Sequence, residues 1–467
     1  MAAVIDSPQP APALLLLPVA IGDGARTLAF DAAGRVSLAT FLGHVRGVAA
    51  LLPDHACAIN LCEDRYRFLV AFCAVAARCQ VTLLPPSRTR AAIDDVRDGH
   101  PDSYCVGDGD PCGCDLPPVA LLPHYFRLPA VLPTRAGPVP YVDPGAVALI
   151  GYSSGSTGRP TPSPKTWRSL TVSNAQNMAA LATLGDAGRE VVATVPPQHM
   201  YGMELSVLLP LLGGAAVHAA RPFFPGDVAR ALGDAKTPPL LVTTPVHLRA
   251  LLASGVALPA LAGIVTATAP LAQALAAEAE TRFRCEVREL FGSTETCVIA
   301  SRRTAHEGAW RAYDGVRLLP QPDGAQVVAA HLDAPALLSD LVELRGERHF
   351  LVRGRQSDMV EVAGKRASLA ELTRRLLAIP GVDDGVVVQS DDADAGGVRR
   401  VAALAVSATL DEAAILRALR VAVDPVFLPR PLRCVAALPR NATGKLPHAE
   451  ILAMLRSNNP APGSHAG

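Results

Sequence analysis

The chain is short of lysine, of aromatic side chains and of net charge. It has only four lysines among 467 residues, aromatic residues make up 4%, and 43 basic residues balance 43 acidic ones. A chain without net charge has no overall field that would attract nucleic acid or an anionic membrane. It also lacks an apolar run of the ~20 residues that span a bilayer. We therefore expect neither a nucleic-acid-binding protein nor a membrane-spanning one.

Two other kinds of site also lack their usual pattern. Ten cysteines are scattered along the chain, and the one cluster, Cys105, Cys112 and Cys114, has no second CxxC pair and no nearby histidine. This spacing disfavours a zinc site. Asp6 stands where a secretory signal peptide carries positive charge. We therefore expect reduced thiols and a cytoplasmic location.

Half of the residues are hydrophobic, which is enough for a large core. Strand-like and helical stretches alternate between residues 146 and about 290, which predicts a parallel, doubly wound α/β sheet. The predicted strands are 146–153, 191–197, 213–220, 240–245, 263–270 and 285–292. The predicted helices are 244–255, 271–283 and one that starts at Met203.

The pattern changes after residue 300. Closely spaced strands predict a small β subdomain, and from about residue 356 a compact α+β unit follows, with helices at 369–377 and near 410–421. We therefore divide the chain into a large N-terminal domain, a small C-terminal domain and a disordered tail, over residues 1–354, 355–455 and 456–467.

The stretch from Tyr152 to Trp167, YSSGSTGRPTPSPKTW, places small polar residues directly after a predicted strand. Successive N–H groups and hydroxyls in such a turn form an anion-binding site. The predicted phosphate contacts are Ser153, Ser154, Gly155, Ser156, Thr157 and Gly158. A Walker A loop is absent because no lysine directly follows Gly155 or Gly158, and Lys165 comes later. On its own, the stretch is equally typical of a polar linker.

Further stretches carry residues that suit a nucleotide. In LFGSTET, Glu295 adjoins a Gly-Ser-Thr turn at a strand end, where a carboxylate can hold Mg²⁺ against phosphate oxygens. Asp340 can accept both hydroxyls of a ribose diol, and Arg355 can donate beside it. Lys445 follows a Thr-Gly turn near the end of the predicted folded chain. In a protein with four lysines, this placement indicates a chemical role.

The order and spacing of these stretches, from about residue 146 to 451, resemble the adenylate-forming ligases. This superfamily includes acyl-CoA synthetases, aryl-acid ligases, peptide-synthetase adenylation domains and luciferase. The matching stretches are YSSGSTGRP, PPQHMYGM, TATAPL, FGSTE, the segment with Asp340 and Arg355, GKR and NATGK. The resemblance implies a large AMP-binding domain and a small mobile C-terminal domain. It also implies ATP and Mg²⁺, with a carboxylate attacking ATP to give acyl-AMP and a thiol then displacing AMP.

The resemblance also assigns roles to single residues. Lys445 would be the mobile catalytic lysine, Glu295 the Mg²⁺ ligand and His199 the histidine of the acyl pocket. The implied adenine and ribose contacts are Thr268, Ala269, Phe291, Gly292, Ser293, Thr294, Asp340 and Arg355. Tyr201 and Gly202 would join His199 in the acyl pocket, Gly364 and Lys365 would act in thioester formation, and Ser357 would be the hinge. Two positions depart from the family's pattern. The lysine that usually follows the proline of the phosphate loop directly comes later in this chain, as Lys165, and Glu361 stands where the family often has a lysine.

The sequence disfavours amino acids as the acid substrate. Amino-acid-activating relatives carry an aspartate just after the position of His199, whereas this chain has Met200, and Glu204 falls a turn too far on. The short chain and its SPKTW segment resemble the small ligases of aryl-polyene and xanthomonadin-type pigments, which implies transfer of an aryl acid such as 4-hydroxybenzoate to an acyl carrier protein. The alternatives are CoA as the acceptor, an inactive nucleotide-binding relative, and a metal-binding module at Cys105–Cys114.

Overall fold

The structure is a computed structural model that describes residues 15–109, 124–154, 160–184, 190–355, 359–362, 365–393, 399–440 and 446–456. The chain divides into two compact units. The first contains residues 1–26, 37–62 and 67–171, and the second contains residues 27–36, 63–66 and 172–467. Each unit is built on its own large sheet.

The first unit contains a six-stranded sheet in the order β10-β9-β5-β4-β6-β7. Its strands are parallel except β10, which pairs antiparallel with β9. The bounds are β10 Pro160–Thr166, β9 Val147–Ser154, β5 Val81–Leu84, β4 Cys57–Asn60, β6 Ser103–Gly107 and β7 Tyr125–Arg127. The accompanying helices are α1 Leu38–Ala49 and α3 Arg90–Asp98, and a short pair joins β1 Leu17–Pro18 to β8 Tyr141–Val142. Two further helices are shared between the units: α2 Arg65–Ala77 belongs to the first unit from residue 67 on, and α4 Trp167–Ala180 belongs to the second from residue 172 on.

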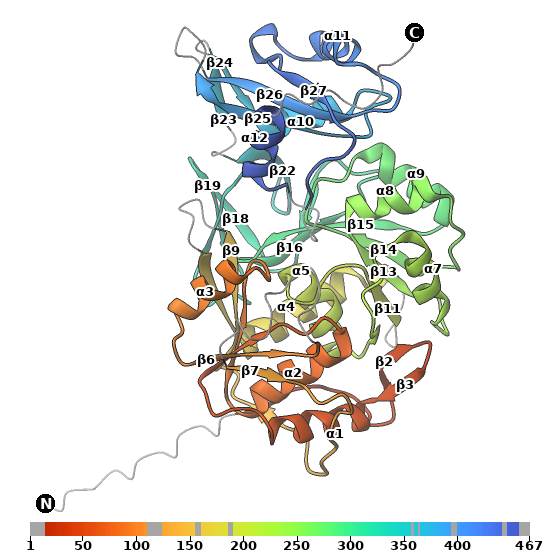
Figure 1. Ribbon diagram of the computed structural model, residues 1–467, viewed down its shortest axis with the longest axis vertical. Helices are drawn as coiled ribbons and strands as arrows, with labels where there is room; N and C mark the ends of the chain where they lie inside the picture. Colours follow the sequence, from red (N-terminus) through yellow and green to blue (C-terminus); the bar gives the residue numbers. More distant parts are fainter. Residues whose placement is uncertain are drawn as a thin grey trace, which may run out of the picture. The chain divides into compact units, whose positions relative to one another are not determined.

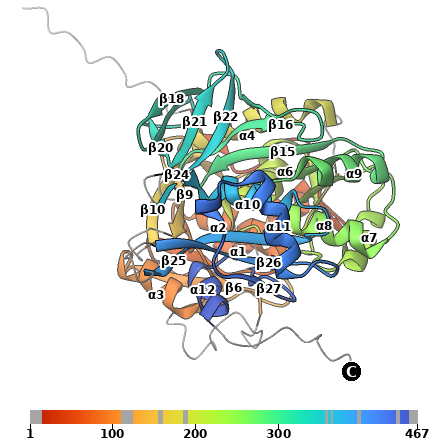
Figure 2. The ribbon, with the colours of Figure 1, turned by 90° about the horizontal axis from the view of Figure 1, so that it is seen from above.

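The second unit contains an eleven-stranded sheet in the order β21-β22-β17-β16-β15-β14-β13-β11-β12-β2-β3 (Figure 1). From β15 to β2 the neighbouring strands are parallel, and from β15 to β21 they are antiparallel. The parallel strands are β15 Val287–Ser293, β14 Gly263–Thr266, β13 Leu240–Thr243, β11 Glu190–Ala193, β12 Ala216–His218 and β2 Thr27–Asp31, with β3 Gly34–Ser37 at the edge. The antiparallel strands are β16 Cys297–Arg302, β17 Trp310–Ala312, β22 His349–Arg355 and β21 Asp340–Leu344. Of these, β21 and β22 can be seen side by side in Figure 2.

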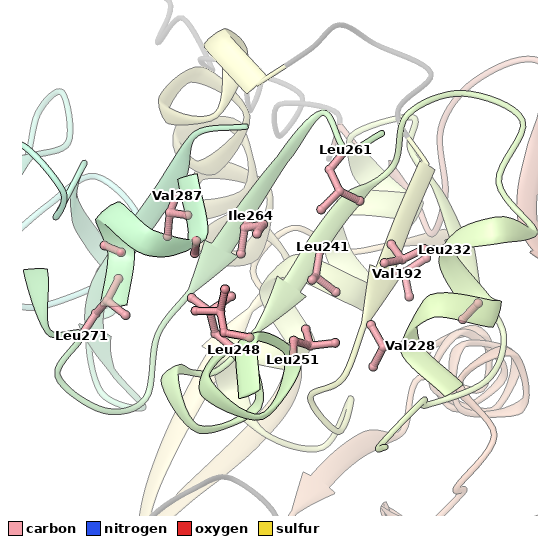
Figure 3. Packing of buried hydrophobic residues seen from close by; sticks show 14 of the residues in the cluster. Val192, Val228, Leu232, Leu241, Leu248, Leu251, Leu261, Ile264, Leu271 and Val287 are labelled. Carbon is pink, nitrogen blue, oxygen red and sulfur yellow. The ribbon is translucent and has the colours of Figure 1, made fainter. Parts of the chain in front are cut away.

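Three helices cover one face of the parallel strands. They are α7 Pro225–Gly233, α8 Pro245–Ser254 and α9 Gln273–Phe283. Leu248 and Leu251 of α8 pack with Leu241 and Ile264 of the sheet in one buried cluster (Figure 3). The sequence explains the limits of α8, because the Thr244 hydroxyl accepts from the N–H of His247, Pro245 fits the first turn, and Gly255 ends the helix in a left-handed conformation.

A helical segment follows β11 and consists of three parts. They are α5 Met200–Met203, the π-helical turn η3 Glu204–Leu208 and α6 Leu209–Leu212. Almost every residue of this segment is buried. A π-helical turn widens the helix by one residue, and such turns occur frequently at functional sites.

The remaining elements of the second unit form smaller sheets. A three-stranded sheet contains β18 Arg317–Gln321, β19 Gly324–Val328 and β20 Ala336–Leu338, and a hairpin joins β23 Met359–Val362 to β24 Lys365–Ser368. The last sheet contains β25 Asp384–Ala393, β26 Arg399–Val406 and β27 Leu432–Cys434, accompanied by α10 Leu369–Leu377, α11 Glu412–Ala422 and α12 His448–Arg456. Short 3₁₀ turns lie at Ala182–Leu184 and Pro425–Phe427.

The predicted α/β class and the strand–helix alternation are confirmed, with one difference. The strand predicted at 146–153 is β9, which belongs to the sheet of the first unit, whereas the strands predicted from 191 to 292 form the sheet of the second unit. The chain leaves one sheet through β10 and α4, and the pattern of Pro160–Thr166 hides this strand because proline alternates with polar residues. None of the helices in the described part of the chain has the length and apolar character that crossing a bilayer requires.

Candidate active site

The carboxyl ends of four parallel strands define one edge of the second unit's sheet. These strands, β11, β13, β14 and β15, are hydrogen-bonded neighbours. The predicted acyl segment around His199 follows β11, the predicted adenine turn at Thr268 follows β14, and Glu295 follows β15. Since ligands of open α/β sheets bind beyond the carboxyl ends of the strands, the fold brings these three predicted regions to the edge where a ligand is expected.

Glu295 lies on the tight turn between β15 and β16. Ser293 and Thr296 close this turn reciprocally: the Thr296 hydroxyl accepts from the Ser293 N–H at 3.0 Å, and the Ser293 hydroxyl accepts from the Thr296 N–H at 3.1 Å. Gly292 is required beside it, because a Cβ there would lie 2.0 Å from the Cys297 carbonyl oxygen. The Ser293 hydroxyl therefore holds the turn, while Thr294 and Glu295 remain half-buried at its tip.

Phe291, which was predicted to contact the adenine, packs against two other aromatic rings. Its ring packs against Trp310 at 5.1 Å and Phe350 at 5.7 Å between ring centroids. These contacts connect β15 to β17 and β22. Phe291 therefore contributes to the packing that supports the Gly292–Glu295 turn.

The turn after β14 is strained at Thr268. Its φ is +80°, a conformation that a β-branched residue rarely adopts. The Glu289 carboxylate of the neighbouring strand accepts from the Leu271 N–H at 3.0 Å, and this bond holds the turn containing Thr268 and Ala269 against β15. Backbone strain of this kind concentrates at ligand-binding sites, where surrounding contacts maintain it.

His199 is the N-cap residue of α5, and its side chain makes no capping bond. Its N–H donates to the Pro196 carbonyl at 3.3 Å, and its own carbonyl accepts from Met203 at 2.7 Å. The backbone of Gly202 lies so close to Pro196 that a Cβ at position 202 would be 2.0 Å from the Pro196 carbonyl oxygen. Gly202 therefore allows the turn of residues 196–199 to fold onto the helix, with His199 half-buried at its end.

Tyr201 forms a wall of the same region. Its side chain is buried, and its hydroxyl donates to the Val265 carbonyl at 2.9 Å. Burial raises the pKa of this phenol well above its ordinary value, so it stays protonated. Tyr201 thus ties α5 to β14 through its hydroxyl.

The carboxylate of Glu204, on the π-helical turn, is buried and has several hydrogen-bond donors. It accepts from the Ser173 hydroxyl at 2.7 Å, the Asn177 amide at 3.0 Å and the Val298 N–H at 3.1 Å. The Tyr313 hydroxyl in turn donates to the side-chain amide oxygen Oδ1 of Asn177 at 3.1 Å. This network joins η3 to α4 and β16, so Glu204 acts as a structural anion in the described structure.

The first unit contains the strand that leads into the glycine-rich turn. Ser153 and Ser154 end β9, and the register pairs Ser154 with Pro160 and Leu149 with Lys165. Five residues of extended strand therefore separate Lys165 from the end of the hairpin, about 17 Å. Lys165 is also only 4% exposed. The phosphate contact of Lys165 stays a prediction, and the described register places its backbone at the base of the hairpin.

The register of β21 and β22 pairs Asp340 with Arg355, so the two predicted ribose contacts come together through the backbone. Lys365 opens β24 and pairs with Val362. The other predicted site residues, which are Gly155, Ser156, Thr157, Gly158, Ser357, Gly364 and Lys445, lie outside the described residues, as do Cys112 and Cys114. Cys105 is a buried residue of β6.

Three charged residues near this edge are buried, which the sequence did not predict: Arg65, Glu204 and Glu289. Each bonds to backbone groups that lie far away in the sequence. A single charged residue in a sequence gives no sign of such partners, since it is typical of a solvated surface. Only their apolar neighbours could have suggested burial.

Solved structures of adenylate-forming ligases share this fold. MatB from Rhodopseudomonas palustris, solved with ATP, has a TM-score of 0.78 at 19% identity, covering 93% of this chain and 97% of its own. o-Succinylbenzoate CoA synthetase (MenE) from Bacillus subtilis, solved with its acyl-adenylate intermediate, has a TM-score of 0.76 at 17% identity, covering 91% of this chain and 94% of its own. The likeness to these structures shows that the chain has the fold of the adenylate-forming ligases.

Sequence relatives give the family. A 4-coumarate–CoA ligase of Halorhodospira halophila is 31% identical over 322 residues, 64% of this chain and 74% of its own length. A sulfoacetate–CoA ligase of Cupriavidus necator is 27% identical over 385 residues, 73% of this chain and 74% of its own. The profile of the AMP-binding enzyme family matches residues 66–322. The chain belongs to the AMP-binding enzyme family, and it is an ATP-using acid–thiol ligase.

Proposed function

We propose that the protein activates an aryl acid such as 4-hydroxybenzoate as its aroyl-adenylate and transfers the aroyl group to the thiol of an acyl carrier protein, forming a thioester, in the cytoplasm. The observation that carries the acid class is the set of groups around His199. Met200 brings no charge, and the Glu204 carboxylate already accepts from three groups. Among the described residues of this segment, the one carboxylate is thus already bonded within the protein, which supports an acid with a neutral aryl group over one with an ammonium group, and Tyr201 would contribute to the wall of the pocket.

In the first step, a substrate carboxylate oxygen attacks the α-phosphorus of ATP, and pyrophosphate leaves. Thr268 and Ala269 would contact the adenine, together with Gly292–Thr294 on the adjoining strand end, and Asp340 and Arg355 would contact the ribose. Ser153, Ser154 and the 155–158 turn would donate to the β- and γ-phosphates. Lys445 would bridge the carboxylate and α-phosphate oxygens, where negative charge develops.

Glu295 would hold Mg²⁺. Its carboxylate is half-buried on a turn whose other side chains are neutral hydroxyls, which suits a hard oxygen-seeking ion. Among the described residues no group of three or more His, Cys, Asp or Glu side chains could hold a metal alone. Mg²⁺ bound here would therefore take its other ligands from phosphates and water, and it would offset their charge.

In the second step the acceptor thiol attacks the aryl carbonyl carbon, and AMP leaves. We propose that residues 355–455 rotate about Ser357 between the steps, which removes Lys445 and brings Gly364 and Lys365 to the site. CoA is the second candidate acceptor, and it is favoured by the relatives that are named CoA ligases.

The first experiment measures exchange of labelled pyrophosphate into ATP across benzoates, cinnamates and fatty acids. We expect the highest kcat/KM with 4-hydroxybenzoate or a close aryl acid, and the fastest thioester formation with an acyl carrier protein. A preference for fatty or amino acids would contradict the proposed acid class, and higher kcat/KM with CoA would establish the second candidate.

Lys445→Ala provides the test of the mechanism. We expect this variant to lose at least 10²-fold in adenylation rate while its affinity for ATP stays within about twofold, because Lys445 acts on charge that develops in the transition state. Arg456→Ala, at the end of α12, is the control and should retain wild-type turnover. Wild-type turnover in Lys445→Ala would overturn the role given to this lysine.

A further inference from the structure

Arg65 is a fully buried cation that belongs to the second unit. It begins α2, and its exposed fraction is 0%. Its N–H donates to the Ala219 carbonyl at 2.9 Å. Burial first, and the Arg221 cation second, lower the pKa of the Arg65 guanidinium to about 9, which leaves it charged at neutral pH. A buried charge needs well-placed partners to be tolerated, so the contacts of this side chain indicate its role.

The guanidinium makes five hydrogen bonds. One terminal nitrogen donates to the carbonyls of Ala193 at 3.0 Å and Val195 at 2.7 Å, at the end of β11. The other donates to the carbonyls of His218 at 3.2 Å and Ala220 at 2.8 Å, at the end of β12.

The fifth hydrogen bond of the guanidinium is made to the helical segment that follows β11. Nε donates to the Ser206 hydroxyl at 3.1 Å, and this hydroxyl donates to the Gly202 carbonyl at 2.7 Å. Ser206 lies on the π-helical turn, after α5. Arg65 therefore holds both ends of one segment: Ala193 and Val195 precede His199, and Ser206 follows it.

The chemistry of the side chain suits this task. The guanidinium is a rigid planar fork with five N–H donors, and here all five bonds are made to neutral oxygens that belong to three different elements. A lysine at the same place has three donors on a flexible stem and cannot reach both strand ends and the helix. The bonds thus depend on the shape of arginine as well as on its charge.

We propose that Arg65 is a positioning residue for the acid substrate, closing the segment 193–206 so that His199 is held at a fixed place beyond β11. This inference rests on the proposed role of His199 in the acyl pocket. A change at Arg65 should therefore weaken binding of the acid and leave binding of ATP unaltered. The adenine turn and the Glu295 turn follow β14 and β15, and the described hydrogen bonds of Arg65 do not reach them.

The main variant is Arg65→Lys, which keeps the charge and loses the fork. Labelled pyrophosphate exchange with 4-hydroxybenzoate should show a KM for the acid raised at least tenfold, while the KM for ATP changes less than twofold. Ser206→Ala removes only the hydroxyl that connects Arg65 to the π-helical turn, and it should raise the KM for the acid by about threefold. Arg35→Lys is the matched control, since Arg35 pairs with Glu190 at the opposite end of β11, and both KM values should stay within twofold.

A second readout does not depend on the identity of the acid. Amide hydrogen exchange followed by mass spectrometry should become at least tenfold faster in peptides covering residues 194–206 of Arg65→Lys, with little change in β13 and β14. If wild-type protein shows no exchange activity with 4-hydroxybenzoate, the proposed acid is wrong and this measurement still tests Arg65.

Three outcomes would overturn the role of Arg65. They are equal rises of both KM values, an unchanged acid KM in Arg65→Lys, and hydrogen exchange that is unchanged or faster throughout the sheet. If Arg65→Lys does not fold, Ser206→Ala decides by the same measurements, and unchanged acid KM and unchanged exchange at 194–206 in that variant would reject the proposal.

Discussion

Single residues determine how closely the backbone approaches itself at the candidate site, and the glycines show this most directly. Gly202 and Gly292 each lie where a Cβ would be 2.0 Å from a carbonyl oxygen, of Pro196 and Cys297 respectively. Both glycines belong to stretches that were predicted to bind a ligand. The structure adds that each makes room for another backbone segment, so their effect on a ligand is exerted through the turns that they allow.

Gly202→Ala should destabilise the fold and weaken acid binding. The new methyl group forces the 196–199 turn away from α5, and overpacking of this kind costs about 1–3 kcal/mol. Urea denaturation measures the loss, and pyrophosphate exchange should show a raised KM for the acid. Gly233→Ala is the matched control, because nothing lies within 4 Å of its Cβ position in α7. Equal stability of the two variants would contradict the proposed close approach.

Thr268→Gly should stabilise the protein. Glycine adopts positive φ without steric cost, whereas a β-branched residue at +80° stores strain. We expect the free energy of unfolding to rise by about 1 kcal/mol after the added entropy of the unfolded chain is counted. Thr268→Ala retains a Cβ and should give no such gain. A lower midpoint for Thr268→Gly than for Thr268→Ala would contradict the strain assigned to a Cβ at this position.

At the scale of elements, the sequence predicts best where periodicity and capping agree. The helix predicted at 369–377 matches α10 because Ser368 caps it and Glu371 lies in its first turn. The helix predicted at 244–255 matches α8 for similar reasons. β10 was missed because its prolines resemble a loop, and η3 was missed because no sequence signal distinguishes a π-helical turn from an α-helix.

The same limit applies to the candidate site. Segments that follow parallel strands can be placed at one edge from the sequence, which is why His199, Thr268 and Glu295 come to the same edge in the second unit. The sequence could not show that Lys165 pairs with Leu149 and is buried. Register and burial depend on contacts between distant residues, and no local pattern carries that information.

Glu204 stabilises the π-helical turn as an element, and Glu204→Gln tests this. The neutral amide replaces one acceptor by a donor that faces the donors Ser173 and Asn177, leaving buried polar groups unsatisfied. We expect a loss of about 1–3 kcal/mol in the free energy of unfolding. Urea denaturation measures it, with Glu278→Gln on the exposed face of α9 as the control. Stability equal to that of the control would mean that the carboxylate charge is not needed.

At the scale of the whole molecule, we expect His247 to contribute to the dependence of the free energy of unfolding on pH. This histidine is buried where β11 and β13 end, with Nδ1 2.9 Å from the Thr244 hydroxyl and 3.4 Å from the Thr194 hydroxyl. Burial, followed by the nearby Arg221 cation, lowers its pKa from 6.5 to about 4. Its imidazole is therefore neutral in the folded protein at every pH above about 4.

The unfolded chain binds the His247 proton more tightly, so the free energy of unfolding must fall as pH drops through the range between 6.5 and 4. Linkage gives a loss of about 2 kcal/mol between pH 7 and pH 5 from this group alone. Carboxylates with lowered pKa, such as Glu280 and Glu190, lose their contribution mainly at lower pH. Urea denaturation at pH 7, 6 and 5 should show this loss in the wild type and a smaller one in His247→Gln. Parallel curves for the two proteins would show that His247 titrates normally, and that the carboxyl edge of the sheet is open to water at this position.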